Sequence, residues 1–225
     1  MRKLSNDSKV TLIYKIIRDN IATGRWCQDD QFSSFEVAKK YGIGRTTVND
    51  AIKVLEKNGF VTILPNVGFR INALQPQGVK EYFEVRLELE KMLTRHLLAA
   101  ANIDQLNRIK DRLKLALASY ELQQFEVALQ GIEEFHLSIS EILESSYVQR
   151  IFRETEDMEY FILSQLMVYD SPCYLKVLKC KEAFVDAVMA RDRTLSMAIV
   201  EDKCQLMKHG MIEILEKREC NHESS

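Results

Sequence analysis

The sequence has little proline and glycine, with 3 Pro and 8 Gly among its 225 residues. This scarcity argues against a collagen-like or low-complexity chain and against an all-β protein rich in tight turns. The five cysteines are odd in number and form no CxxC pair. We therefore expect free thiols, as in a cytoplasmic protein, at Cys27, Cys173, Cys180, Cys204 and Cys220.

A long apolar run is also absent. The most apolar stretch, residues 160–169, is too short to cross a bilayer and contains Ser164 and Gln165. No apolar segment follows Met1, so we expect neither a signal peptide nor a membrane partner. Leu, Ile, Glu, Lys and Ala dominate instead, and 46% of the residues are hydrophobic. This composition predicts a mostly α-helical protein of one large or two small domains.

The net charge of −2 conceals a difference between two parts of the chain. Residues 1–72 contain 12 basic and 7 acidic residues, a net charge of +5, whereas the remainder contains 19 basic and 26 acidic residues, a net charge of −7. Such an asymmetry indicates a nucleic-acid-binding part joined to a different one, with chance as the alternative.

Residues 9–71 have the pattern of a winged helix-turn-helix, in which three helices precede a β-hairpin. Apolar residues recur at helical spacing over 9–22 and again over 45–58. Between these segments, Ser33 and Glu36 have the spacing of a capping box that begins a short helix. Two β-rich runs, 60–64 and 68–71, predict the hairpin.

The second helix of a helix-turn-helix begins with side chains that face DNA bases. Here those side chains can form hydrogen bonds, because Arg suits guanine and Asn suits adenine. Neighbouring basic residues and the hairpin add possible phosphate or minor-groove contacts. Ordinary solvated polar residues are the alternative. The candidate DNA-binding residues are Ser33, Lys39, Lys40, Arg45, Thr46, Thr47, Asn49, Asn66, Gly68 and Arg70.

The rest of the chain is expected to be an all-α antiparallel helical bundle. Its helical periodicity predicts six helices, at about 79–100, 103–119, 121–144, 147–168, 173–190 and 194–218. Leu74-Gln-Pro-Gln-Gly78 is the one Pro/Gly-marked break before them. The expected domains are therefore a DNA-binding domain at 1–74, a linker at 75–78 and an effector-binding and dimerisation domain at 79–220.

Residues 21–71 resemble the DNA-binding domain of GntR-type bacterial transcription regulators, chiefly through Gly42–Val48, Ala51–Leu55 and Asn58–Phe60. The helical part resembles the effector domain of the FadR subfamily, known as FCD. The matching pieces there are Tyr82–Glu90, Phe135-His136, Ala183–Val188 and Arg191-Asp192. Six helices look more like the shorter, VanR-type branch. The resemblance implies a winged helix-turn-helix regulator with a ligand-binding bundle.

Two positions in the recognition segment depart from the family pattern. The resemblance implies Ser or Thr where Gly44 stands, and commonly Arg where Asn49 stands. A different operator preference or weaker binding would follow. These departures keep open an alternative function, in which the protein is an all-helical ligand sensor whose degenerate DNA domain acts through a protein partner.

The effector-domain resemblance also implies a divalent metal, held by an Asp four residues before a His and by two later His residues. His136 matches the first His, but Ile132 stands at the Asp position and Lys181 and Lys203 at the later His positions. A protonated lysine cannot ligate a metal, so we expect no metal and no other cofactor.

Arg86, His136, Lys181 and Lys203 are instead expected to line a cavity that accepts an anionic effector, a carboxylate or a phosphate. Two alternatives remain: Lys181 and Lys203 lie on solvated faces, or Arg86 is a structural ion-pair partner of Glu90.

The function predicted from the sequence is a ligand-responsive transcription regulator, commonly a repressor in this family. It would be a cytoplasmic homodimer that binds double-stranded DNA, with Leu87, Leu93 and Leu97 as candidate dimer contacts. The sequence has no nucleophile motif or glycine-rich phosphate loop, so we do not expect an enzyme.

Overall fold

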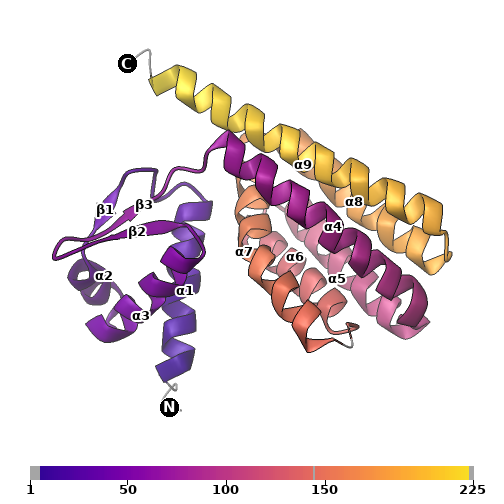
Figure 1. Ribbon diagram of the computed structural model, residues 1–225, viewed down its shortest axis with the longest axis horizontal. Helices are drawn as coiled ribbons and strands as arrows, with labels where there is room; N and C mark the ends of the chain where they lie inside the picture. The colour runs from indigo at the N-terminus through magenta and orange to yellow at the C-terminus, as the bar shows by residue number, and fades with distance from the viewer. Residues whose placement is uncertain (1–5, 144, 223–225) are drawn as a thin grey trace. The chain divides into compact units, whose positions relative to one another are not determined.

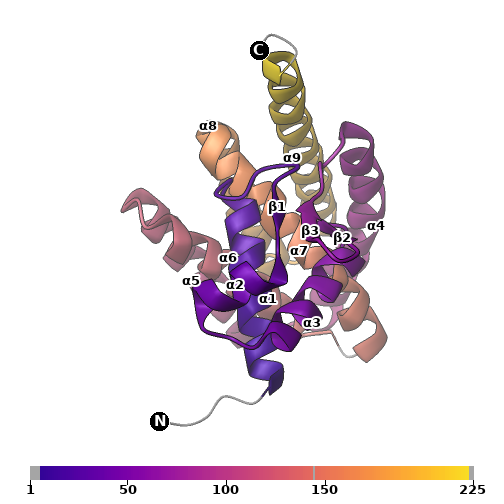
Figure 2. The ribbon, with the colours of Figure 1, turned by 90° about the vertical axis from the view of Figure 1, so that its left-hand side faces the viewer.

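The computed structural model describes residues 6–143 and 145–222, with side chains at 9–143 and 145–218. The chain divides after Leu74 into two compact units. The N-terminal unit consists of α1 (Asn6–Ala22), β1 (Gln31–Phe32), α2 (Ser34–Tyr41), α3 (Arg45–Lys57), β2 (Val61–Leu64) and β3 (Gly68–Ile71). This is a winged helix-turn-helix, as the sequence predicts (Figures 1 and 2).

Local capping determines where α2 begins and ends. Ser33 Oγ accepts a hydrogen bond from the Glu36 backbone N–H at 3.1 Å, and the Glu36 carboxylate accepts one from the Ser33 N–H at 3.0 Å. This is the predicted capping box, which satisfies two N–H groups that have no partner within the helix. Gly42, at a φ of 63°, ends the helix in the left-handed conformation.

The helices of this unit meet in an apolar core. Ile13 and Ile17 of α1 pack with the buried stripe of α3, which contains Val48 and Leu55, and all four side chains are fully buried. The predicted apolar spacing of α1 and α3 is therefore confirmed. Burial of these stripes against each other fixes α3 and leaves its opposite face exposed.

The hairpin is tied to a short strand that the sequence pattern did not reveal. β3 pairs antiparallel with both β2 and β1, in the order β1-β3-β2. Pro65 and Asn66 form the turn between β2 and β3, closed by a 3.1 Å bond from the Val67 N–H to the Leu64 carbonyl. Asn66 has a φ of 63°, which Asn tolerates at the third position of such a turn.

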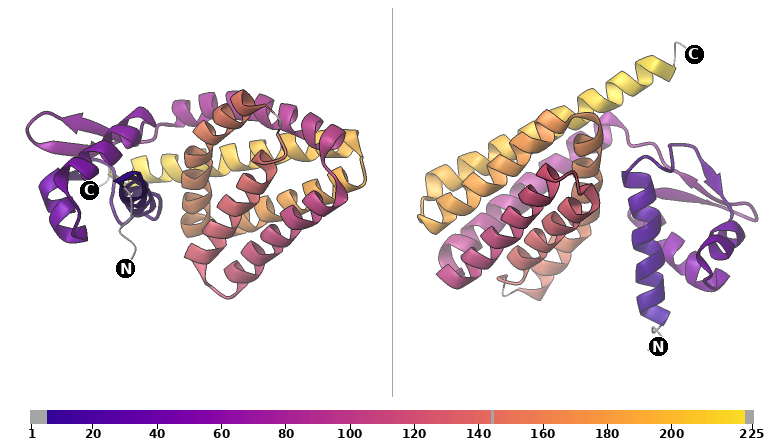
Figure 3. Two further views of the ribbon diagram at one scale, coloured as in Figure 1. Left: turned by 90° about the horizontal axis from the view of Figure 1, so that it is seen from below. Right: turned by 180° about the vertical axis from the view of Figure 1, so that it is seen from behind.

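Six helices form the described part of the second unit: α4 (Pro76–Ala100), α5 (Ile103–Glu121), α6 (Phe125–Ser140), α7 (Ser146–Tyr169), α8 (Ser171–Met189) and α9 (Arg193–His222). They form the expected all-α bundle, in which α9 lies beside α4 and α8, and α5 lies beside α6 (Figure 3). Gly131 of α6 approaches α5 so closely that an added Cβ would lie 2.9 Å from Ala116 Cβ.

Three details of this unit correct the sequence-based expectations. Residues 76–78 are the first turn of α4 rather than a linker, because Pro76 is favourable at the first position of a helix. α6 begins only at Phe125, since Gln123 adopts a φ of 58° and breaks the helix. Leu93 and Leu97 are buried inside the bundle itself, so they are not available as dimer contacts.

Two further findings concern thiols and membranes. Cys27, Cys173, Cys180 and Cys204 are free cysteines, and the side chain of Cys220 lies outside the described ones. Among the described residues, no helix combines the length and the apolar character needed to cross a membrane.

Candidate functional site

The exposed start of α3 is the candidate DNA-contact surface. Arg45 and Thr46 are exposed there and Asn49 is half-buried. Thr47 differs from the expectation, because its side chain is only 7% exposed. It lies one turn before Ala51, on the face of α3 that enters the core, so its side chain is not positioned for a base contact.

The neighbouring candidates divide into exposed cations and structural residues. Lys39 and Lys40 are exposed on the last turn of α2, and Arg70 on β3 is 4.0 Å from Asp29 Oδ1. Ser33 is engaged in the helix cap. Gly68 has a structural reason to be glycine, since an added Cβ would lie 2.0 Å from the Phe32 carbonyl oxygen.

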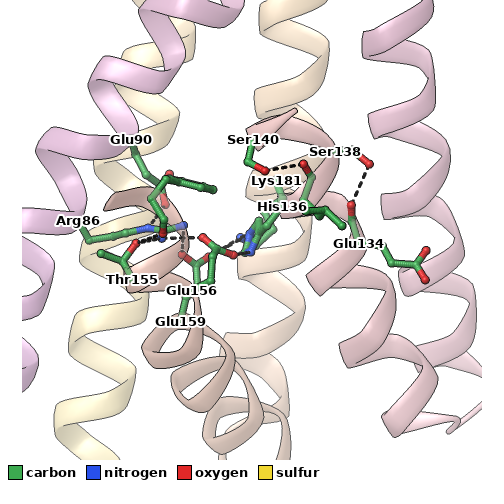
Figure 4. A network of polar contacts seen from close by, with 12 residues as sticks. Arg86, Glu90, Glu134, His136, Ser138, Ser140, Thr155, Glu156, Glu159 and Lys181 are labelled. Atoms are coloured by element: carbon green, nitrogen blue, oxygen red, sulfur yellow. Dashed lines mark hydrogen bonds and ion pairs between the residues drawn. The ribbon is translucent and has the colours of Figure 1, made fainter. Parts of the chain in front are cut away.

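The second candidate site is a charged cluster inside the helical unit. Arg86 of α4, His136 of α6 and Lys181 of α8 come together there (Figure 4). Lys203 of α9 joins them through Glu90, and each of the four basic residues is at most 6% exposed. Burial of both lysines removes the alternative that they lie on solvated faces.

These basic groups are paired with three carboxylates. Arg86 forms ion pairs with Glu90 at 3.0 Å and Glu156 at 2.8 Å, and a third with Glu159. Lys203 Nζ contacts Glu90 at 2.6 Å. The expected alternative pairing of Arg86 with Glu90 is therefore present, alongside the clustering of the cations.

The charge of the cluster is balanced internally. Lys181 Nζ lies 2.7 Å from Glu159 Oε1 and 2.8 Å from His136 Nε2, and His136 Nδ1 lies 2.6 Å from Glu156 Oε2. A neutral imidazole that carries its proton on Nδ1 donates to Glu156 and accepts from Lys181, while its Nε2 also lies 3.2 Å from Glu159 Oε1. Arg86, Lys181 and Lys203 then supply three positive charges against three negative ones from the carboxylates.

Two opposing effects determine the pKa values of the cluster: burial disfavours the charged forms, and ion pairing favours them. Burial by itself raises the pKa of Glu159, but Arg86 and Lys181 outweigh it and hold that pKa well below its ordinary value. The pKa of Glu90 is lowered in the same way, by Lys203 and Arg86. Burial lowers the pKa of Lys181 against the opposing effect of Glu159. Glu90 and Glu159 are thus held in their ionised form within a buried network.

A small cavity borders the cluster. Its volume is about 20 Å³, which is room for about one water molecule. Its polar lining consists of Arg86, Glu90, His136, Lys181 and Lys203, and its apolar lining includes Phe135, Phe152 and Phe184. A metabolite would therefore enter only if these side chains moved.

The positions at which the resemblance implies metal ligands do not fit a metal. Ile132 offers no ligand atom, and both lysines are engaged in ion pairs. His136, Glu156 and Glu159 are the described residues that could provide ligands, with the ligand atoms within 4.8 Å of one another. Arg86 already contacts both of these carboxylates, and Lys181 contacts Glu159 and His136.

Sequence reasoning did not find the carboxylates of α7. In the sequence alone, the acidic run from Glu154 to Glu159 is typical of a solvated helix face, whereas Glu159 is 1% exposed. The spacing of Glu156 and Glu159 was an available signal, since residues three apart lie on one side of a helix. That side also presents Thr155 Oγ1, which accepts a hydrogen bond from Arg86 at 2.5 Å.

A winged helix-turn-helix with an exposed polar recognition helix, joined to a separate helical domain, is typical of DNA-binding transcription regulators. Residues 9–71 match the family model described as bacterial regulatory proteins, gntR family. This match covers the winged helix-turn-helix unit, which is therefore similar to the DNA-binding part of that family.

Two related proteins are themselves described as helix-turn-helix transcriptional regulators. One, from the TAR-I ttuE-ttuC' intergenic region of Agrobacterium vitis, is 29% identical over 136 residues, which are 59% of this chain and 80% of that protein. The other, YdhC of Bacillus subtilis, is 20% identical over 149 residues, 66% of each chain.

Solved structures show the same fold along nearly the whole chain. E. coli McbR/YncC has a TM-score of 0.76 at 16% identity and covers 94% of this chain and 98% of its own. A GntR transcriptional regulator from Rhodococcus sp. RHA1 has a TM-score of 0.74 at 17% identity and covers 92% and 98%. The two-part architecture is therefore shared with these proteins.

Proposed function

We propose that this protein is a sequence-specific repressor that binds double-stranded DNA as a cytoplasmic homodimer and responds to a small anionic metabolite. The observation that supports DNA binding most directly is the exposed start of α3, with Arg45 and Thr46 on a unit whose sequence is net positive. Arg45 contacts base edges in this proposal, while Lys39 and Lys40 contact phosphates.

A dimer is part of the proposal because one recognition helix reads only half of a short palindrome. Regulators of this family usually act as dimers. With Leu93 and Leu97 inside the bundle, Leu87 is the remaining candidate contact of those expected from the sequence.

Arg45→Ala is expected to weaken binding to the preferred DNA fragment by about 1–3 kcal/mol and to reduce the preference for it over other fragments. The measurement is fluorescence anisotropy with genomic fragments over a salt titration. Lys57→Ala is the control, because it removes one exposed positive charge from the opposite end of the same helix.

The two variants distinguish base contact from general electrostatics. If Arg45→Ala binds every fragment as the parent does, the assignment of Arg45 is wrong. If the parent itself shows neither a steep salt dependence nor a fragment preference, the alternative of a sensor that acts through a protein partner replaces the DNA-binding proposal.

The effector site of the proposal is the cavity beside the charged cluster, where Arg86, His136, Lys181 and Lys203 bind a carboxylate or phosphate. Because the cations already have carboxylate partners, an anionic ligand has to displace one of these carboxylates. Glu90 is the carboxylate that lines the cavity, and it contacts both Arg86 and Lys203. An effector that replaces Glu90 would change the packing of α4 against α9, and it shifts the DNA-binding equilibrium if it favours one arrangement.

Glu90→Gln is expected to tighten anion binding, because it removes the internal competitor for Arg86 and Lys203. The gain is about 1.5–3 kcal/mol, or roughly tenfold to a hundredfold in affinity. Thermal-shift titrations with small carboxylates and inorganic phosphate, at constant ionic strength, measure it. Glu88→Gln is the control, since Glu88 is exposed on the same helix. If Glu90→Gln binds no anion of the panel more tightly than the parent, the anionic effector is wrong.

A further inference from the structure

We propose that Lys181 is a tethered cation that fills a metal-type site formed by His136, Glu156 and Glu159. This site differs from the metal positions implied by the family resemblance, because two of its three groups come from α7. The inference depends neither on DNA binding nor on the proposed effector, and its test measures metal binding alone.

The three groups have the chemistry and the geometry of a cation site. Glu156 and Glu159 are three residues apart on α7 and project toward His136 of α6 (Figure 4). One ligand atom from each lies within 4.8 Å of the others. One imidazole nitrogen and two carboxylate oxygens form a ligand set that divalent transition metals accept.

The Lys181 ammonium lies where such an ion would share ligand atoms. Its Nζ is 2.8 Å from His136 Nε2 and 2.7 Å from Glu159 Oε1, and the side chain is 2% exposed. A metal would approach the same atoms to about 2.0–2.2 Å. Both cations therefore compete for the same lone pairs, and Lys181 has the advantage of being covalently attached.

Charge balance also explains why a metal is excluded while Lys181 is present. The three carboxylates of the cluster offset Arg86, Lys181 and Lys203, so a divalent ion would add two uncompensated charges to a buried site. Without Lys181 the cluster has one excess negative charge, which attracts a divalent ion. The Lys181 ammonium thus occupies the site permanently, and the cluster needs no bound metal for its charge balance.

Lys181→Ala is expected to bind one Mn²⁺ at least about tenfold more tightly than the parent, because it removes the competing cation and leaves one uncompensated negative charge in a buried site. Mn²⁺ is the probe because carboxylate oxygens suit it, whereas thiolates prefer softer ions. Electron paramagnetic resonance of free Mn²⁺ measures the affinity after chelator treatment. Lys179→Ala, which removes an exposed lysine from the same helix, should bind as the parent does.

A second substitution tests the ligand assignment. His136→Ala combined with Lys181→Ala should lose the gained Mn²⁺ site. Lys181→Gln serves if Lys181→Ala is unfolded without metal, and one equivalent of Mn²⁺ should then raise its melting temperature. The proposal is overturned if the parent binds one Mn²⁺ as tightly as the variants, if neither variant gains affinity, or if the double variant keeps the site.

Discussion

Replacing Glu159 by glutamine is expected to lower the free energy of unfolding of the helical unit by about 3–5 kcal/mol, the cost of removing one partner from a buried ion network. Glu159 is 1% exposed and contacts Arg86, Lys181 and His136. Glutamine keeps the size of the side chain but not its charge, so two buried cations lose their shared partner. Urea denaturation followed by far-ultraviolet circular dichroism measures the loss.

The control is Glu154→Gln, which neutralises an exposed carboxylate on the same helix and should change stability by less than about 0.5 kcal/mol. The pH dependence of the unfolding free energy is a second measure of the stabilisation by Glu159. The pKa of Glu159 is well below its ordinary value of 4.5, so its stabilisation is present above pH 4.5 and is lost as the pH falls below it. Glu159→Gln should therefore flatten this acid dependence. If Glu159→Gln changes the free energy of unfolding no more than the control does, the ion pairs of Glu159 do not stabilise the protein beyond the cost of desolvating them.

The fold could be predicted from the sequence because apolar periodicity and capping are local signals. Val48 and Leu55 mark the buried face of α3, and Ser33 with Glu36 marks the start of α2. The strand β1 could not be predicted in this way. It consists of two residues and exists only because β3 pairs with it, at a separation of almost forty residues.

The charged cluster could be predicted only in part. Its basic members were found through a family resemblance, but the partners of Lys181 depend on how α7 packs against α6 and α8. The spacing of Glu156 and Glu159 indicates that they share one side of α7, but it does not indicate that this side is buried, since Glu154 of the same acidic run is exposed. Only the tertiary packing brings carboxylates next to the basic residues, so that their charges are neutralised within the protein.

This balance changes what the helical unit is expected to recognise. An unpaired group of cations would attract any small anion, whereas a paired group binds only a ligand that replaces an internal carboxylate in both charge and geometry. Specificity for the effector would then come from competition with Glu90. The same reasoning separates the roles of the two lysines that line the cavity, because Lys203 pairs with Glu90, which is part of the lining, whereas Lys181 pairs with Glu159, which is not.

Gly68→Ala is expected to destabilise the winged unit by more than about 4 kcal/mol, an effect of the size seen for severe backbone strain and overpacking. An alanine Cβ would lie 2.0 Å from the Phe32 carbonyl oxygen and 2.9 Å from Ser33 Cα, and Gly68 has a φ of 148°. Both obstacles are backbone atoms, so no side-chain rotation relieves the clash. β1 would have to separate from β3, and the cap of α2 at Ser33 would move with it.

The single tryptophan of the chain can report the separation of β1 from β3. Trp26 is 7% exposed, and its ring stacks on Phe32 with centroids 4.0 Å apart, so its fluorescence follows the strand that Gly68 approaches. Gly44→Ala is the matched control in the same unit, because its added Cβ meets only Thr47 Oγ1, at 3.9 Å. A urea midpoint for Gly68→Ala equal to that of Gly44→Ala would contradict the steric account. The expected result is loss of Trp26 burial together with loss of DNA binding, since the same backbone segment holds both the wing and the start of α2.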